Sequence, residues 1–70
     1  MNAPEPTFTV TVCRRWVAGP KRGRHDTVTL HGVDAQGLAD WHTRRREGTQ
    51  LAAHGVWGRY IVHEVRAVSP

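Results

Sequence analysis

The sequence predicts a small α+β domain of order β-β-α-β, in which a three-stranded sheet carries one helix on one face. Three observations favour this fold. Residues 7–17 and 25–31 largely alternate between apolar and polar side chains, as half-buried strands do. Residues 34–47 place apolar side chains at helical spacing between two capping residues. Residues 56–68 are rich in valine and aromatic side chains, which are favoured in strands.

The first two strands are expected to form a β-hairpin. The first strand begins at Thr7 and continues as far as Val17, with its apolar side chains on one face and threonines on the other. The hairpin tip, residues 18–24, reads AGPKRGR, and its glycines and proline interrupt regular structure among three basic residues. Alternation resumes over residues 25–31. We therefore expect a long basic loop between two strands whose outer face is rich in threonine.

The helix is expected from about Asp34 to Glu47. Asp34 is a favourable N-cap, and Val33 and Leu38 have the spacing of a hydrophobic staple. Three arginines stand in the last turn, where cations complement the helix dipole. Gly48 suits the left-handed position that commonly follows a helix.

The segment after the helix is harder to interpret. Residues 49–55 are ambiguous and are compatible with a short helical turn. The last strand, residues 56–68, is placed along the outer edge of the first strand, antiparallel to it. Its apolar residues occupy both odd and even positions, which is typical of a strand covered on both faces. We expect this strand, or its Tyr60 and Val62 face, to form a homodimer interface. Alternatively, these two residues pack within one chain, under the N-terminus or residues 49–55.

Length and composition limit the class of protein. Residues 7–70 are enough for one domain, and residues 1–6 are expected to be a disordered lead-in. About a dozen large apolar side chains make a marginal core, which also favours a homodimer. The single cysteine excludes an internal disulfide, and no apolar run reaches the roughly 18 residues of a membrane helix. Because the N-terminus lacks the features of a secretory signal, we expect a cytoplasmic protein without membrane contacts.

The charge balance favours an acidic partner. The chain has 10 lysine and arginine residues against 6 aspartate and glutamate residues, a formal net charge of +4, and nine of its cations are arginine. Arginine binds phosphate in a bidentate manner, although a GC-rich coding sequence would also enrich it. The candidate nucleic-acid-binding residues are the cations near the hairpin, at the helix end and at the start of the last strand: Arg14, Arg15, Lys21, Arg22, Arg24, His25, Arg44, Arg45, Arg46 and Arg59.

Two functions compete. The first is a small, basic, non-enzymatic accessory or regulatory protein that binds DNA or RNA, with Trp16, Trp57 and Tyr60 either stacking on bases or belonging to the core. The second is a protein-interaction module that binds an acidic host or partner protein, or pairs with an exposed strand.

The sequence offers few residues suited to catalysis or metal binding. Cys13 is the only thiol and is expected to be structural. The five histidines fall on different elements, with His31 and His63 as the pair placed to be neighbours on the sheet. Their spacing matches no common metal site, and the glycines form no phosphate-binding loop. We therefore expect no enzyme activity, no metal and no cofactor.

The order of a strand hairpin, the helix sequence GVDAQGLADW and a valine-rich last strand resembles that of short uncharacterised proteins of GC-rich bacteria and their phages. The resemblance covers most of the chain. It implies an intracellular accessory protein of a bacterium or a phage, and it transfers no functional residues.

Overall fold

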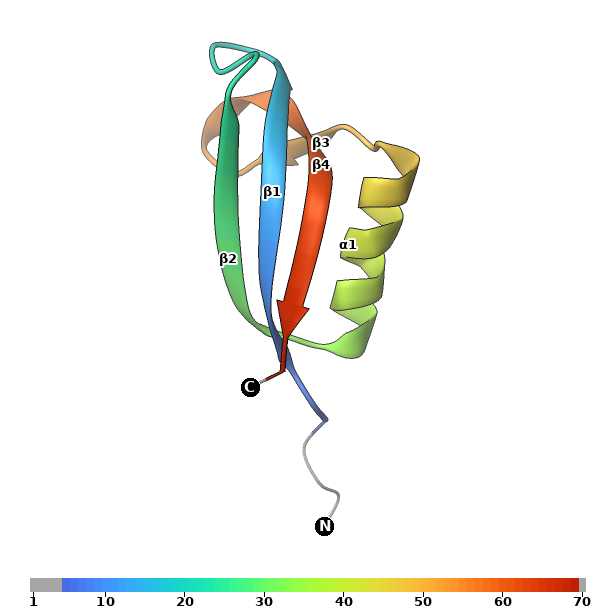
Figure 1. Ribbon diagram of the computed structural model, residues 1–70. Coiled ribbons are helices and arrows are strands. Elements are labelled where there is room, and N and C mark those ends of the chain that lie inside the picture. The colour runs from blue at the N-terminus through green and yellow to red at the C-terminus, as the bar shows by residue number, and fades with distance from the viewer. Residues whose placement is uncertain (1–4, 70) are drawn as a thin grey trace.

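Alternating apolar residues build the first two strands of the computed structural model, which describes residues 5–69 (Figure 1). β1 (Phe8–Ala18) and β2 (His25–Val33) pair antiparallel, with Val12 opposite Val28 and Val10 opposite Leu30. The predicted hairpin is therefore confirmed. The predicted lead-in, residues 1–6, lies mostly outside the described residues, and its last two residues have no regular secondary structure.

The helix is capped as predicted. α1 (Ala35–Glu47) begins after Asp34, whose side-chain Oδ1 accepts a hydrogen bond from the Gly37 N–H at 2.7 Å. It ends at Gly48, which has a φ of 66° and donates its N–H to the carbonyl of Arg44 at 3.0 Å. Among the described residues, no helix has the length and apolar character needed to cross a membrane.

The segment after the helix corrects the sequence prediction. It contains a short strand, β3 (Leu51–Ala53), in place of a helical turn, and β4 (Val56–Val68) follows it. The sheet is antiparallel with four strands in the order β2-β1-β4-β3, where three were expected. The placement of the last strand beside β1 is confirmed. Three residues are too few to display an alternation, so the sequence pattern does not reveal β3. Gly55, which has a φ of 74°, forms the turn between β3 and β4.

A β-bulge in β4 explains why its apolar residues occupy both odd and even positions in the sequence. Cys13 lies opposite Glu64, but Arg14 lies opposite Val62, so His63 is the extra residue. The extra residue reverses which positions of the strand face inward. Tyr60 and Val62 therefore lie on the same face as Val65. Tyr60 is 6% exposed and Val62 is 2% exposed within the single chain. They are therefore core residues, and the predicted homodimer interface on these side chains is wrong.

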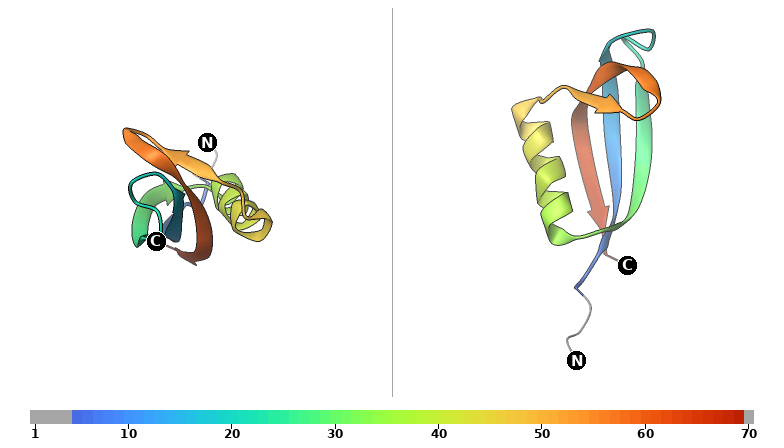
Figure 2. Two further views of the ribbon diagram at one scale, coloured as in Figure 1. Left: turned by 90° about the horizontal axis from the view of Figure 1, so that it is seen from above. Right: turned by 180° about the vertical axis from the view of Figure 1, so that it is seen from behind.

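The sheet has one covered face and one open face (Figure 2). α1 packs mainly on β4, and the β3–β4 hairpin curls over the same side of the sheet. We call this side the inner face; it carries the buried core residues Val10, Val12, Trp16, Tyr60 and Val62. The opposite side, the outer face, is formed by β2, β1 and β4. No element of residues 5–69 covers the outer face.

Candidate nucleic-acid interface

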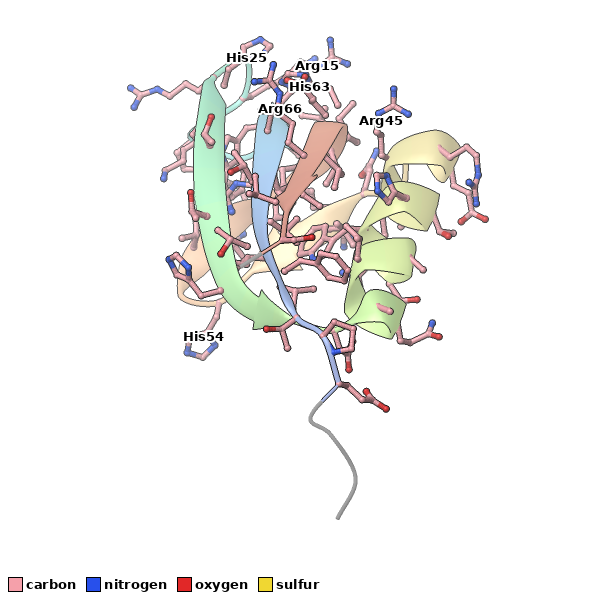
Figure 3. All side chains as sticks on the ribbon, turned by 60° about the horizontal axis from the view of Figure 1, so that its bottom comes forward. Arg15, His25, Arg45, His54, His63 and Arg66 are labelled. Atoms are coloured by element: carbon pink, nitrogen blue, oxygen red, sulfur yellow. The ribbon has the colours of Figure 1, made fainter. Side chains whose placement is uncertain are left out.

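Four basic side chains from three strands meet on the outer face: Arg15 of β1, His25 of β2, and His63 and Arg66 of β4. Arg15 lies opposite His25 in the register of the hairpin. The imidazole rings of His25 and His63 meet edge to face, with 5.6 Å between their centroids. Figure 3 shows all four side chains projecting toward the same side of the molecule. The strand pairing therefore joins residues that are up to 51 positions apart in sequence.

Around this basic group the outer face has both polar and apolar side chains, with Ile61 opposite Arg15 and Val68 opposite Thr9. It carries threonine side chains from β1 and β2, including Thr9, which is hydrogen-bonded to His31 Nδ1 at 3.4 Å. His31 is thus a neighbour of Thr9, and the expected pairing of His31 with His63 is replaced by that of His25 with His63. Hydroxyl groups of this kind are common donors to phosphate oxygens.

One acid interrupts the positive charge. Glu64 accepts a hydrogen bond from Arg66 Nε at 2.9 Å and a weaker one from Cys13 Sγ at 3.5 Å. The Arg66 hydrogen bond, followed by that of Cys13, lowers the pKa of the Glu64 carboxyl. Glu64 is therefore a carboxylate at neutral pH, and it neutralises part of the charge that Arg66 brings.

The hairpin tip, which precedes His25 in the chain, carries three further cations. The N–H of Arg22 donates to Gly19 O at 3.1 Å, and the N–H of Arg24 donates to Lys21 O at 2.9 Å. These bonds make the tip an ordered turn. Arg22 and Arg24 are exposed on it, whereas the half-buried Lys21 holds its ammonium 5.3 Å from the centroid of the Trp16 ring.

Arg14 is not part of the outer face. Its guanidinium binds both carboxylate oxygens of Asp26, with Nε–Oδ1 at 2.7 Å and Nη2–Oδ2 at 2.8 Å. It lies 4.7 Å from the ring centroid of Tyr60 and 5.2 Å from that of Trp16. Trp16 Nε1 also donates to Asp26 Oδ2 at 3.1 Å. Arg14 is therefore a structural residue of the inner face.

The same contacts shift the pKa values of Arg14 and Asp26. Hydrogen bonding to Asp26 raises the pKa of Arg14, against the opposing effect of burial. Hydrogen bonding from Arg14 lowers the pKa of Asp26, and the indole N–H of Trp16 adds to this effect. Both partners are held in their charged forms.

The arginines at the end of α1 have different environments. Arg44 is half-buried, with its guanidinium 4.9 Å from the ring centroid of Trp41. Arg46 is exposed and donates to Thr43 Oγ1 on its own helix at 3.3 Å. Arg45 is exposed and points toward the same side as the outer face (Figure 3).

The sequence-predicted set therefore separates into groups. The structure brings together Arg15 and His25 on the outer face, with Arg45 pointing to the same side. Arg22 and Arg24 are exposed at the hairpin tip. Arg59 is exposed and pairs with Ala18 at the end of the sheet that carries the tip. Lys21 and Arg44 lie against tryptophan rings, and Arg14 belongs to the inner face.

Two residues of the basic group, His63 and Arg66, were not among the predicted binding residues. His63 was expected on the sheet beside His31, and the structure places it beside His25 at the bulge. Arg66 follows the inward-facing Val65, so its outward direction could have been found from alternation alone.

Tryptophan, tyrosine and phenylalanine side chains are absent from the part of the outer face that the structure describes. Trp16 and Tyr60 are buried on the inner face, and Trp57 is exposed at the β3–β4 turn. Residues 5–69 also hold no group of three or more metal-ligating side chains. Comparison of the chain with protein-family models, with curated proteins and with solved structures gives no match.

Proposed function

We propose that this chain is a nucleic-acid-binding accessory or regulatory protein that holds DNA or RNA on the outer face of its sheet, mainly through phosphate contacts. The observation that carries the proposal is the convergence of Arg15, His25, His63 and Arg66 on a face that no described element covers. Arginines recognise phosphate through paired N–H donors, and cations on a flat surface follow a charged backbone.

The surroundings support phosphate contact. Threonine hydroxyls between the cations are suited to the same phosphate oxygens. Arg22 and Arg24 add two exposed cations at the hairpin tip, next to His25 in the chain. Because the aromatic rings of Trp16 and Tyr60 lie on the inner face, the outer face offers few groups for reading bases. We therefore expect binding that depends weakly on sequence.

The test is fluorescence anisotropy with labelled DNA and RNA oligonucleotides at several salt concentrations. Affinity should fall steeply as the salt concentration rises. On duplex DNA, the slope of log K against log salt concentration should be smaller for the double variant Arg15→Gln/Arg66→Gln, by about 0.9 for each phosphate that the variant no longer neutralises. His25→Gln and His54→Gln form a matched pair, since His54 points away from the outer face (Figure 3). The first should weaken binding and the second should not. Absence of binding to every oligonucleotide at low salt would reject the proposal.

A protein partner is the second candidate, because β2 is an edge strand of nine residues. Trp16 N–H donates to Arg24 O at 2.9 Å, so the register directs the even-numbered backbone groups of β2 toward β1 and the odd-numbered ones to the free edge. A strand of an acidic partner, or β2 of a second copy, could pair there. In an antiparallel pair of copies centred on Thr29, Val28 would lie opposite Leu30 on the inner side.

Sedimentation of the purified chain tests the second copy. We expect a concentration-dependent dimer that Thr29→Pro abolishes, because the N–H of Thr29 faces the free edge and is not used by β1. A monomer at high protein concentration would reject the homodimer. A dimer that is unchanged in the variant would show that its interface does not include the edge of β2.

A further inference from the structure

Trp57 is the most exposed large apolar side chain among residues 5–69. Its exposed fraction is 77%, while the other two tryptophans are buried or half-buried in the core. Tryptophan is seldom left this open in a folded domain, because burying its ring is strongly favourable. An exposed ring of this size is commonly a contact for another molecule.

Trp57 borders an open hollow between the end of β1 and the β3–β4 hairpin. The hollow has a volume of about 360 Å³, and its lining includes Ala18, Gly19, Trp57, Gly58 and Arg59. The backbones at Gly19 and Gly58 touch, since a Cβ on Gly19 would lie 2.7 Å from Gly58 Cα. This part of the lining is therefore bare backbone, and the open space of the hollow lies beside it and Trp57.

One cation lines the hollow, and two more exposed cations follow its Gly19 edge along the chain. Arg59 belongs to its lining and is exposed. Gly19 leads directly into the hairpin tip, where Arg22 and Arg24 are also exposed. A ligand that matches both features has a planar π system and a negative charge close to it. An unpaired nucleotide has this combination, with a base to stack on indole and a phosphate to meet a guanidinium.

We infer that this hollow takes one unpaired nucleotide, whose base stacks on Trp57 and whose phosphate contacts Arg59, so that the chain prefers single-stranded over duplex nucleic acid. The inference rests on the proposed function and adds selectivity to it. Bases in a duplex are already stacked on one another and do not reach the ring of Trp57. The outer face holds phosphates of either form, whereas the hollow favours the form with free bases.

The decisive experiment compares a labelled oligothymidine with a duplex of the same length. Trp57→Ala should weaken binding of the single strand by at least about fivefold, the lower end of what one stacked base contributes. Binding of the duplex should change less than about twofold. Trp57→Phe keeps a ring and should retain most of the single-strand affinity.

Intrinsic fluorescence supplies a second readout. Trp16 is 1% exposed and Trp41 is half-buried, so stacking of a base should quench mainly Trp57. Titration of unlabelled oligothymidine should quench the wild-type emission, and Trp57→Phe should remove most of that quenching. Melting temperatures of the variants should stay close to wild type, because Trp57 contributes little to the core.

The outcomes separate this inference from the proposed function. If Trp57→Ala weakens single strand and duplex equally, or weakens neither, the nucleotide site is rejected while phosphate binding on the outer face stands. If neither form binds even at low salt, the proposed function itself fails. A single-strand preference that Trp57→Ala abolishes supports both.

Discussion

Arg14 and Asp26 form a bidentate ion pair on the inner face of the sheet, with both hydrogen bonds shorter than 3 Å. The pair is anchored by Trp16, which donates its indole N–H to Asp26, and by Tyr60, against whose ring the guanidinium lies. Trp16 and Tyr60 in turn meet edge to face with centroids 5.3 Å apart. Adjacent arginines on β1 therefore have different roles: Arg14 stabilises the fold, and Arg15 projects from the outer face.

We predict that glutamine at these two positions affects different properties of the protein. Arg14→Gln should lower the free energy of unfolding by about 1–3 kcal/mol, because it removes charge-assisted hydrogen bonds and leaves Asp26 partly buried without its cation. Arg15→Gln should leave stability within about 0.5 kcal/mol of wild type but weaken nucleic-acid binding. Thermal denaturation and oligonucleotide titration of both variants measure the two effects. Equal losses of affinity per folded molecule would show that the two arginines do not differ in role.

Asp26 also predicts the response of stability to acid. The folded chain holds the pKa of Asp26 below its ordinary value, mainly through Arg14, so the unfolded chain binds the proton more readily. The contribution of Asp26 is fully present above the unfolded pKa of about 3.9 and is lost as pH falls through the lower folded pKa. Denaturant unfolding from pH 6 down to pH 2 should therefore show stability declining below about pH 4.

Asp26→Asn is the matched variant for this pH dependence. It should be less stable than wild type at pH 6, and the difference should shrink toward pH 2. A constant difference across this range would mean that Asp26 titrates at the same pH in the folded and unfolded chains.

The elements that follow from local chemistry were predictable. The threonine–valine alternation gives the two faces of β1, and Asp34 and Gly48 give the ends of α1 to within one residue. β3 and the bulge at His63 were not predictable, because both depend on pairing with β4 or β1. The failed dimer interface followed from the bulge, since an unbroken alternation would have turned Tyr60 outward.

The candidate interface was partly predictable for the same reason. Arg14 and Arg15 look alike in the sequence, and only the register that places Asp26 opposite Arg14 tells them apart. Arg44 was predicted as a phosphate ligand, but Trp41 three residues earlier lies on the same side of α1 and packs beneath its guanidinium. Charge composition indicates how many cations a chain has. The fold decides which of them remain free.

Gly58 in β4 lies so close to the backbone of β1 that we expect no other residue to fit there without strain. Gly58 has a φ of 137°, and a Cβ there would lie 2.6 Å from the carbonyl oxygen of Ala18. We predict that Gly58→Ala lowers the free energy of unfolding by more than about 2 kcal/mol, through strain and displacement of β1 from β4. Gly55→Ala is the control, because Gly55 also has a positive φ but has no atom near its added Cβ. Gly55→Ala should lower the free energy of unfolding, measured with denaturant, by only about 1 kcal/mol. Equal destabilisation of the two variants would show that conformation alone, without the close approach, accounts for Gly58.

Glu64 should oppose the binding of nucleic acid, because it is the acid that contacts Arg66 within the basic face. Glu64→Gln removes a negative charge from this face and releases Arg66 for phosphate. We predict affinity about two- to fivefold higher, and a salt dependence of log K steeper by up to about 0.9. Glu47→Gln makes the same change in net charge at the exposed end of α1 and is the control. If anisotropy titrations show the same increase in both variants, overall charge explains the effect. A larger increase for Glu64→Gln locates the bound phosphates beside Arg66.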